Sequence, residues 1–235
     1  MPHQEIGLGG YWWDARGRAN ALACGNIRHQ RELVSCTSNA MKIHRQTIKE
    51  ALAELPRQRV GLFVAACAQR VSRACVAFEG VSRNESKAIR EQALGVLWST
   101  AISGRMDDRV AQKLTGERLR LVPDEATAGK TCAISMYDAG LVCMIYSLEY
   151  LRSGVLQEAV WCADRAVEAA ELWDVEQNPR QYDQMPTSFP LVKGPFAIAE
   201  VGFQERVAIE LGRPTVDGEA VRERARAEEH RFWQE

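Results

Sequence analysis

The segment from Pro56 to Phe78 constrains the fold more than any other part of the chain. Its apolar residues recur at intervals of three and four positions, which is the period of an α-helix. The stripe is wide and predicts a helix that lies deep in a bundle, with other helices packed around it. The residues of this stripe are Val60, Phe63, Val64, Cys67, Val71, Ala74, Cys75 and Phe78.

The same period recurs from Met41 onward, and no strand-like alternation of useful length interrupts it. The sequence therefore predicts an all-α fold, a compact bundle of about seven to eight helices with an irregular N-terminal arm. Four prolines within 177–195 predict a long loop there. The fourth helix is the weakest, because Thr115-Gly116 interrupts its middle. The expected helices cover about 41–55, 56–78, 131–152, 155–176, 196–211 and 219–233. Between the second and the third of these we expect two more, one that starts from a cap at Ser82 or Asn84 and stops at Gly104, and a weaker one that starts from a cap at Asp107 or Asp108.

The first forty residues differ from the rest of the chain. Five glycines punctuate them, and their only apolar cluster is Tyr11-Trp12-Trp13. We expect an irregular peripheral arm at 1–40, followed by a single helical domain at 41–235. Ser38-Asn39-Ala40 before Met41 also resembles the scar left by tag removal. A second interpretation is therefore that the arm is a non-native extension.

The composition is that of a globular protein, with 46% hydrophobic and 26% charged residues. The chain has seven cysteines and no C-x-x-C motif, and most of them stand among apolar residues at helical spacing. This pattern is typical of free, buried thiols, and it predicts a reducing, cytoplasmic location. No apolar run approaches the roughly 18 residues of a membrane helix, and so we expect no membrane partner.

Acidic residues gather on one side of the helix expected at 155–176. Asp164, Glu168 and Glu171 recur at i, i+4 and i+7 and therefore share a helix face. The charge of the whole chain is also uneven, because residues 121–200 carry 5 Lys and Arg against 12 Asp and Glu. The acidic face is either a solvated surface or a docking surface for a basic protein partner. We do not expect nucleic acid to bind there, because its phosphates would be repelled.

A second polar pair is expected inside the bundle. Asp138 stands on the apolar side of its helix, and Arg70 lies close to the stripe of the central helix. A carboxylate in such a place has to be paired or neutral. One interpretation is a buried ion pair that fixes the packing, and the other is an acid in a ligand pocket.

The motifs of common catalytic and metal sites are incomplete. Gly129-Lys130-Thr131 ends like a phosphate-binding loop, but Asp124 stands where that motif needs its first glycine. None of the four histidines has a second histidine or cysteine at metal-binding spacing, and no G-x-S-x-G motif occurs. The sequence predicts no cofactor, no metal site and no catalytic residue. It leaves enzymatic activity open and favours a non-catalytic function.

Part of the chain, roughly residues 50–178, resembles the YjaG-like proteins, the bacterial domain-of-unknown-function family 416. In that family a Phe, an Arg, a second Phe, a helix-ending Trp and a helical Asp recur in this order. Gln69 departs from the pattern, because the family often has Glu before the Arg. The resemblance implies an all-helical, cytosolic bacterial protein and no activity, since the family is functionally uncharacterised. The matching residues are Phe63, Arg70, Phe78, Trp98 and Asp138.

These observations favour a non-catalytic protein–protein interaction module of adaptor or immunity type. It would bind a protein partner, or a second copy of itself, through the acidic face. The alternative is a small-molecule-binding protein or an enzyme with a pocket around two of the residues named above. The candidate binding residues are Asp164, Glu168, Glu171, Arg70 and Asp138.

Overall fold

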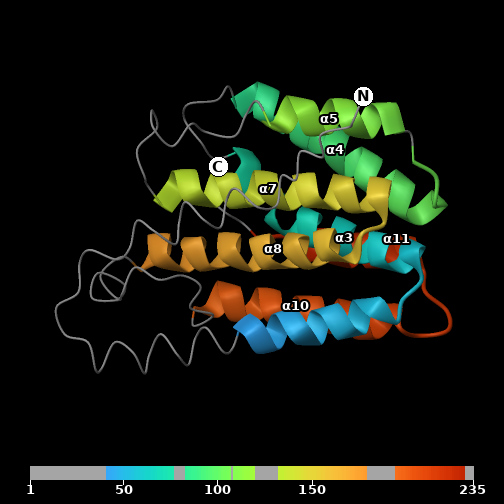
Figure 1. Ribbon diagram of the computed structural model, residues 1–235. Helices are drawn as coiled ribbons and strands as arrows, with labels where there is room; N and C mark the ends of the chain where they lie inside the picture. Colours follow the sequence, from blue (N-terminus) through green and yellow to red (C-terminus); the bar gives the residue numbers. More distant parts are fainter. Residues whose placement is uncertain (1–40, 77–82, 107, 120–131, 179–193, 231–235) are drawn as a thin grey trace, which may run out of the picture. The chain divides into compact units, whose positions relative to one another are not determined.

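A computed structural model describes residues 41–76, 83–106, 108–119, 132–178 and 194–230 (Figure 1). These residues all belong to one unit of the chain, Thr37–Glu235. The expected arm at 1–40 and most of the proline-rich loop lie outside the described residues.

The described part of the chain is mostly helical and contains no strand, which confirms the predicted all-α bundle. A helix over residues 41–53, called helix 41–53 below, comes first. The elements that follow are α3 (Arg57–Val71), the 3₁₀-helix η1 (Ser72–Val76), α4 (Arg83–Ser103), α5 (Asp108–Leu119), α7 (Cys132–Ser153), α8 (Leu156–Gln177), α10 (Pro195–Leu211) and α11 (Gly218–Ala227).

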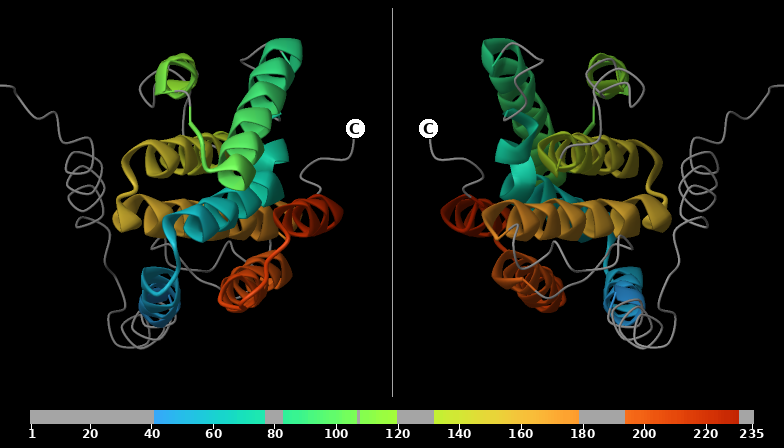
Figure 2. Two further views of the ribbon diagram at one scale, coloured as in Figure 1. Left: turned by 90° about the vertical axis from the view of Figure 1, so that its right-hand side faces the viewer. Right: turned by 90° about the vertical axis from the view of Figure 1, so that its left-hand side faces the viewer.

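Helix α3 is the centre of the bundle, as its apolar stripe predicts. Every residue from Val60 to Val71 is buried, and α3 packs against α4, α7, α8, α10 and α11. Two turned views show it between these helices (Figure 2). Phe63 is completely enclosed, and burial of such a side chain contributes roughly 1.5–3 kcal/mol.

Helices α7 and α8 form the most extensive contact in the described part of the chain. They run antiparallel and side by side (Figures 1 and 2). Gly154 makes the sharp turn between them with a φ of 72°, a left-handed conformation that other residues adopt only with strain. Glycine at 154 is thus what allows these two long helices to follow each other directly.

Two helix boundaries and one helix interior differ from the prediction. The central α-helix ends at Val71, because the N–H of Ser72 bonds to the carbonyl of Gln69 and the chain continues as η1. Helix α5 passes through Gly116 without a break. Helix α11 stops at Ala227, well before residue 233, and the chain then turns so that the N–H of His230 bonds to the carbonyl of Arg70.

The first turn of α3 caps the C-terminal ends of three other helices. Arg57 donates to the carbonyls of Leu151 and Arg152 at the end of α7. Gln58 donates to the carbonyl of Ile102 at the end of α4, over 2.7 Å. Arg59 donates to three carbonyls at and after the end of α10, namely those of Leu211, Arg213 and Pro214. Helix ends carry unsatisfied carbonyls and a partial negative charge, and so these side chains bind the outer helices to α3.

Helix α7 is long and apolar enough to cross a membrane, the one such helix among the described residues. The search for uninterrupted apolar runs in the sequence did not identify this helix, because it applied a stricter criterion. In the bundle, however, 56% of its most apolar window is buried against other parts of the protein. Core helices of globular proteins meet the same criteria of length and composition.

Candidate functional site

A buried polar cluster lies where the C-terminal end of α3 meets α10 and the segment after α11. Arg70 is only 4% exposed, and its Nε donates to Oε2 of Glu200 over 2.9 Å. Glu200 is completely buried. The other end of the guanidinium bonds to the carbonyl of Glu228, and its Cζ lies 4.4 Å from the ring centre of Phe203. Arg70 therefore links α3, α10 and the C-terminal segment.

The carboxylate of Glu200 is ionised. Burial alone would raise its pKa, but the hydrogen bond from His230 and the positive charge of Arg70 outweigh burial and lower the pKa to about 2. Nε2 of His230 lies 2.8 Å from Oε2 of Glu200 and 3.0 Å from Nη2 of Arg70. A ring nitrogen cannot accept from arginine and donate to a carboxylate with one atom, and so the ionised carboxylate favours the tautomer in which Nε2–H donates to Glu200.

The cluster continues through Gln204 to His44. The amide nitrogen of Gln204 donates to Oε1 of Glu200 over 3.0 Å and to the carbonyl of Ala163 over 3.1 Å. Its amide oxygen is thereby directed at Nε2 of His44, 2.9 Å away. Because that oxygen can only accept, Nε2 of His44 carries the hydrogen.

The other ring nitrogen of His44, Nδ1, has no hydrogen-bond partner among the described residues, although the side chain is only 5% exposed. The nearest charged atom is Oε1 of Glu205 at 3.6 Å. That distance is too long for a hydrogen bond but within the range of an ion pair when both ring nitrogens carry hydrogen. Nδ1 of His44 therefore faces the half-exposed carboxylate of Glu205 at the edge of the buried cluster.

The expected pairing of Arg70 with Asp138 is wrong. The polar contacts of Arg70 are made with Glu200, Glu228 and His230, and these residues come from α10 and the C-terminal segment. Asp138 is half-buried on α7, and it acts electrostatically on Arg165 of the neighbouring helix α8. The two residues face different neighbours and do not line a common pocket.

Helix α8 does bring Asp164, Glu168 and Glu171 to one side, but they do not form an open acidic face. Asp164 is 14% exposed and lies 2.7 Å from Arg45. Glu168 is 26% exposed and accepts from Arg165 over 2.5 Å, and Glu171 is only 3% exposed. Docking of a basic partner on these carboxylates remains a prediction, and their burial and existing ion pairs do not favour it.

Asp174, which lies three residues after Glu171 on α8, caps another helix. Its Oδ1 accepts from the N–H of Phe196 over 3.1 Å, and its Oδ2 accepts from the N–H of Ala197 over 2.9 Å. Both N–H groups belong to the first turn of α10, whose own N-cap residue, Gly194, offers no side-chain cap. A Cβ on Gly194 would lie 2.0 Å from the Asp174 carboxyl carbon, and so only glycine allows this approach.

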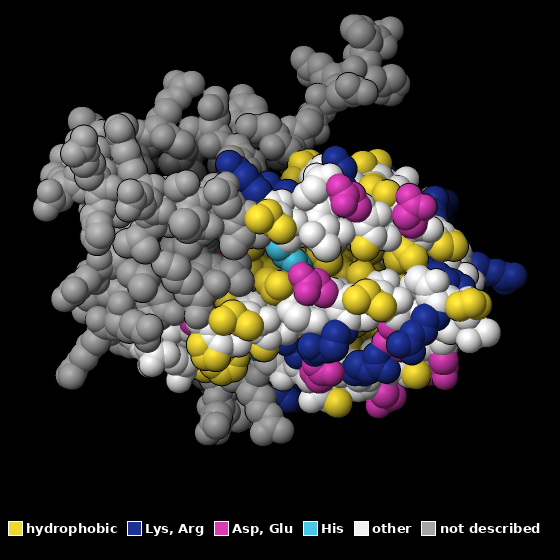
Figure 3. Space-filling model, turned by 90° about the horizontal axis from the view of Figure 1, so that it is seen from below, with side chains coloured by type: hydrophobic (Ala, Val, Ile, Leu, Met, Phe, Trp, Pro, Cys, Tyr) yellow, Lys and Arg dark blue, Asp and Glu magenta, His cyan; other side chains and the backbone are white. Residues whose placement is uncertain are grey.

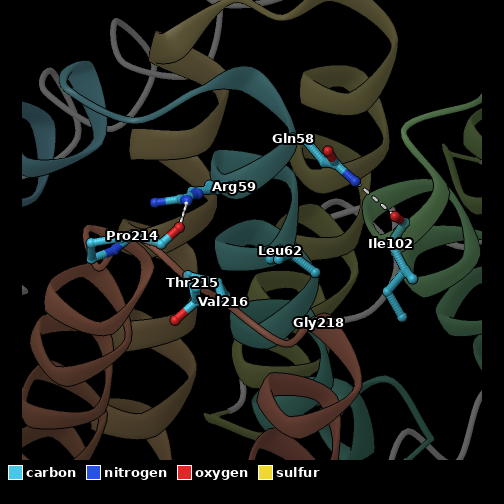
Figure 4. A pocket seen from close by; sticks show the side chains of 8 residues that line it. All are labelled: Gln58, Arg59, Leu62, Ile102, Pro214, Thr215, Val216 and Gly218. Carbon is cyan, nitrogen blue, oxygen red and sulfur yellow. Dashed lines mark hydrogen bonds between the residues drawn. The ribbon is translucent and has the colours of Figure 1, made fainter.

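A hollow of about 430 Å³ opens where the first turn of α3 meets the connection between α10 and α11 (Figure 4). The side chains of Arg59 and Gln58 point along it, but both are already bonded to the carbonyls of Pro214 and Ile102. The hollow therefore presents little free polar chemistry to a ligand. Its lining consists of Gln58, Arg59, Leu62, Ile102, Pro214, Thr215, Val216 and Gly218.

The five cysteines in the described part of the chain are free thiols. Sγ of Cys143 lies 3.6 Å from Sγ of Cys162, between α7 and α8. Burial raises the pKa of the Cys67 and Cys143 thiols well above the usual value, which keeps them protonated. Among the described residues no group of three His, Cys, Asp or Glu side chains could hold a metal ion.

One face of the bundle exposes large apolar side chains. It is formed by helix 41–53 and α10, which lie side by side at the bottom of Figure 1, and it is shown from below in Figure 3. Ile43 is 66% exposed on helix 41–53, and Ile198 and Ile209 of α10 are 55% and 69% exposed. Hydrophobic patches lie on both helices and along the strip between them (Figure 3). We call this surface the isoleucine face.

The buried cluster is not evident when its members are taken one at a time. His44 and His230 have mostly polar neighbours in the sequence, yet both are only 5% exposed. A signal for Glu200 and Gln204 is present in the sequence. They fall on the same helix side as Ala197, Val207 and Leu211, all of them buried, and polar residues on an apolar stripe indicate a buried network.

No model of a known protein family, no curated protein and no solved structure matches this chain. The resemblance to the YjaG-like proteins therefore stays a prediction. Of its residues, Phe63 and Trp98 are core side chains, Arg70 belongs to the buried cluster, and Phe78 lies outside the described residues.

Proposed function

We propose that the protein is a non-catalytic helical module that binds a protein partner through its isoleucine face. The observation that carries the proposal is the exposure of Ile43, Ile198 and Ile209 on two adjacent helices. Isolated exposed apolar residues are ordinary, but several on one face are typical of interaction sites. Aliphatic side chains on a helical surface suit the docking of another helix.

The buried cluster supports a non-catalytic interpretation. Its carboxylate is completely buried, and its arginine and two histidines are each at most 5% exposed. A catalytic acid or base has to come within hydrogen-bond reach of a substrate, directly or through one water molecule. We assign these groups to stabilising the bundle, and we assign partner binding to the outer surface of the bundle.

The proposal is tested by substitutions on the isoleucine face. The purified protein is used to capture a stoichiometric partner from its native cells, and the purified partner is then titrated against Ile198→Glu and Ile209→Glu. Each substitution places a charge in the contact, and we expect the dissociation constant to rise at least about tenfold. Val155→Glu is the matched control, because Val155 is 52% exposed at the start of α8.

Unchanged affinity in both isoleucine variants would show that the isoleucine face does not bind the partner. Failure to recover any stoichiometric partner would contradict the proposed function. A partner that is lost only on Glu168→Lys would move the binding site to the acidic side of α8.

A further inference from the structure

Three cysteines meet in the core between α3, α7 and α8. Sγ of Cys143 on α7 lies 3.6 Å from Sγ of Cys162 on α8, and the thiol of Cys67 on α3 also bonds to Cys162. All three side chains are completely buried. Two sulfurs at 3.6 Å are in van der Waals contact, and so no other atom stands between Cys143 and Cys162. The α7–α8 hairpin thus holds two free thiols directly against each other.

Small residues let the two helices approach closely at this point. Ala159 and Ala166 stand one turn before and one turn after Cys162, on the same side of α8, and both are completely buried. A disulfide needs its two Sγ atoms at about 2.05 Å. Closing the pair therefore takes a movement of about 1.5 Å, which rotations about the two Cα–Cβ bonds supply while both helices stay intact.

The two thiols differ in their readiness to ionise. Burial alone would raise the pKa of the Cys162 thiol, but hydrogen bonds from Cys143, Cys67 and Ser147 outweigh burial and lower the pKa below its usual value. Oγ of Ser147 lies 3.1 Å from Sγ of Cys162. Cys143 stays protonated, because burial raises the pKa of its thiol. A thiolate beside a neutral thiol is the arrangement of an oxidisable cysteine and its resolving partner.

We infer that Cys143 and Cys162 form a peroxide-modification site that closes to a disulfide across the α7–α8 hairpin. First, the Cys162 thiolate attacks one oxygen of hydrogen peroxide. An S–O bond forms, the O–O bond breaks, and the leaving hydroxide takes up the proton that Cys162 released.

In the second step the sulfur of Cys143 attacks the sulfenic sulfur of Cys162. The S–S bond forms, the S–O bond breaks, and water leaves with the proton of the Cys143 thiol. In sum the two thiols lose two hydrogens and two electrons, and hydrogen peroxide is reduced to two molecules of water.

The burial of the pair determines which oxidants react with it. Hydrogen peroxide is uncharged and close to water in size, and so a small local opening between α7 and α8 is enough to admit it. A bulky oxidant such as oxidised glutathione would need both sulfurs to reach the surface, and both are completely enclosed. We therefore expect the pair to respond to peroxide and not to exchange with disulfides while the protein is folded.

The test uses the full chain with Cys24→Ser and Cys36→Ser, so that the two cysteines outside the described residues do not take part. The reduced, folded protein is treated with hydrogen peroxide and quenched in acid. Its tryptic peptides are then fragmented in a mass spectrometer, which distinguishes Cys143 from Cys132 in the same peptide. We expect a loss of two hydrogens and a crosslink of Cys143 to Cys162. The melting temperature should rise by about 3 °C or more, because the crosslink closes a loop of the unfolded chain.

Substitutions of single thiols serve as controls, with circular dichroism showing that each variant is folded. Cys143→Ala should abolish the loss of two hydrogens, because the sulfenic acid on Cys162 then has no resolving thiol beside it. Cys67→Ala should form the same crosslink as the parent chain. Oxidised glutathione at the same concentration should leave the pair reduced in all folded variants.

Three outcomes would overturn the inference. One is a disulfide of Cys162 with Cys67 in place of Cys143. Another is sulfinic or sulfonic acid on Cys162 without a crosslink. The third is a pair that stays reduced at peroxide concentrations that oxidise Cys132, which is only partly buried. None of these outcomes bears on partner binding by the isoleucine face.

Discussion

Replacing Glu200 by leucine is expected to lower the free energy of unfolding by about 3–5 kcal/mol. Glu200 is completely buried and bonds to Arg70, His230 and Gln204. Its removal leaves a buried guanidinium without its carboxylate, and such a charge cannot escape by losing a proton. Urea unfolding followed by circular dichroism measures the change. As a control, Glu223→Gln on the exposed side of α11 should shift the free energy by no more than about 0.5 kcal/mol.

The destabilisation caused by Glu200→Leu should depend on pH in a defined direction. The pKa of Glu200 is about 2 in the folded protein, against an ordinary value of 4.5. The unfolded chain therefore takes up this proton first, and the stability due to the carboxylate is full above pH 4.5 and disappears as the pH falls towards 2. A shift of this size corresponds to roughly 3 kcal/mol. The difference in unfolding free energy between the wild type and Glu200→Leu should therefore shrink by roughly 3 kcal/mol between about pH 5 and pH 2. A difference that stays constant over this range would contradict an ionised Glu200 carboxylate.

Asp174→Ala is expected to cost about 2–3 kcal/mol. The substitution leaves two N–H groups at the start of α10 without their acceptor, and Asp174 itself is only 1% exposed. Asp174→Asn should lie between the alanine variant and the wild type, because an amide retains one oxygen. Chemical denaturation measures all three.

Asp217→Ala provides a matched comparison for this cap. Asp217 caps α11 through a single bond to the N–H of Glu219 at the surface, and its loss should cost about 1 kcal/mol or less. If Asp174→Ala is no more destabilising than Asp217→Ala, the buried cap does not hold α10 in the way described.

Much of the architecture can be predicted from the period of apolar residues. Phe63 and Cys67 lie on a stripe that identifies α3 as the central helix, because only a helix surrounded by others can bury so wide a face. The positions where helices end are harder to predict from this period. Gly116 interrupts a pattern but not the helix, since it faces open space, and a glycine within a helix costs only about 1 kcal/mol.

The polar contacts between helices could not be predicted in the same way. Periodicity shows that Arg70 lies near the buried side of its helix, but it does not show which helix faces it. Asp138 is the carboxylate expected there, and Glu200 is the one that the fold supplies. Asp174 is a sharper case. It caps α10, a helix that begins only at Pro195, and nothing local in the sequence connects the two.

The central claim is that Arg70 is held by Glu200 at the core of the bundle, and a pair of double-mutant cycles tests it most directly. Unfolding free energies are measured for Arg70→Met, Glu200→Leu and both together, and likewise for Arg70→Met with Asp138→Asn. We predict a coupling of about 2–3 kcal/mol for the first pair, with the double variant more stable than Glu200→Leu alone. For the second pair we predict additivity within about 0.5 kcal/mol. Additivity for Arg70 with Glu200, or strong coupling of Arg70 with Asp138, would contradict the account.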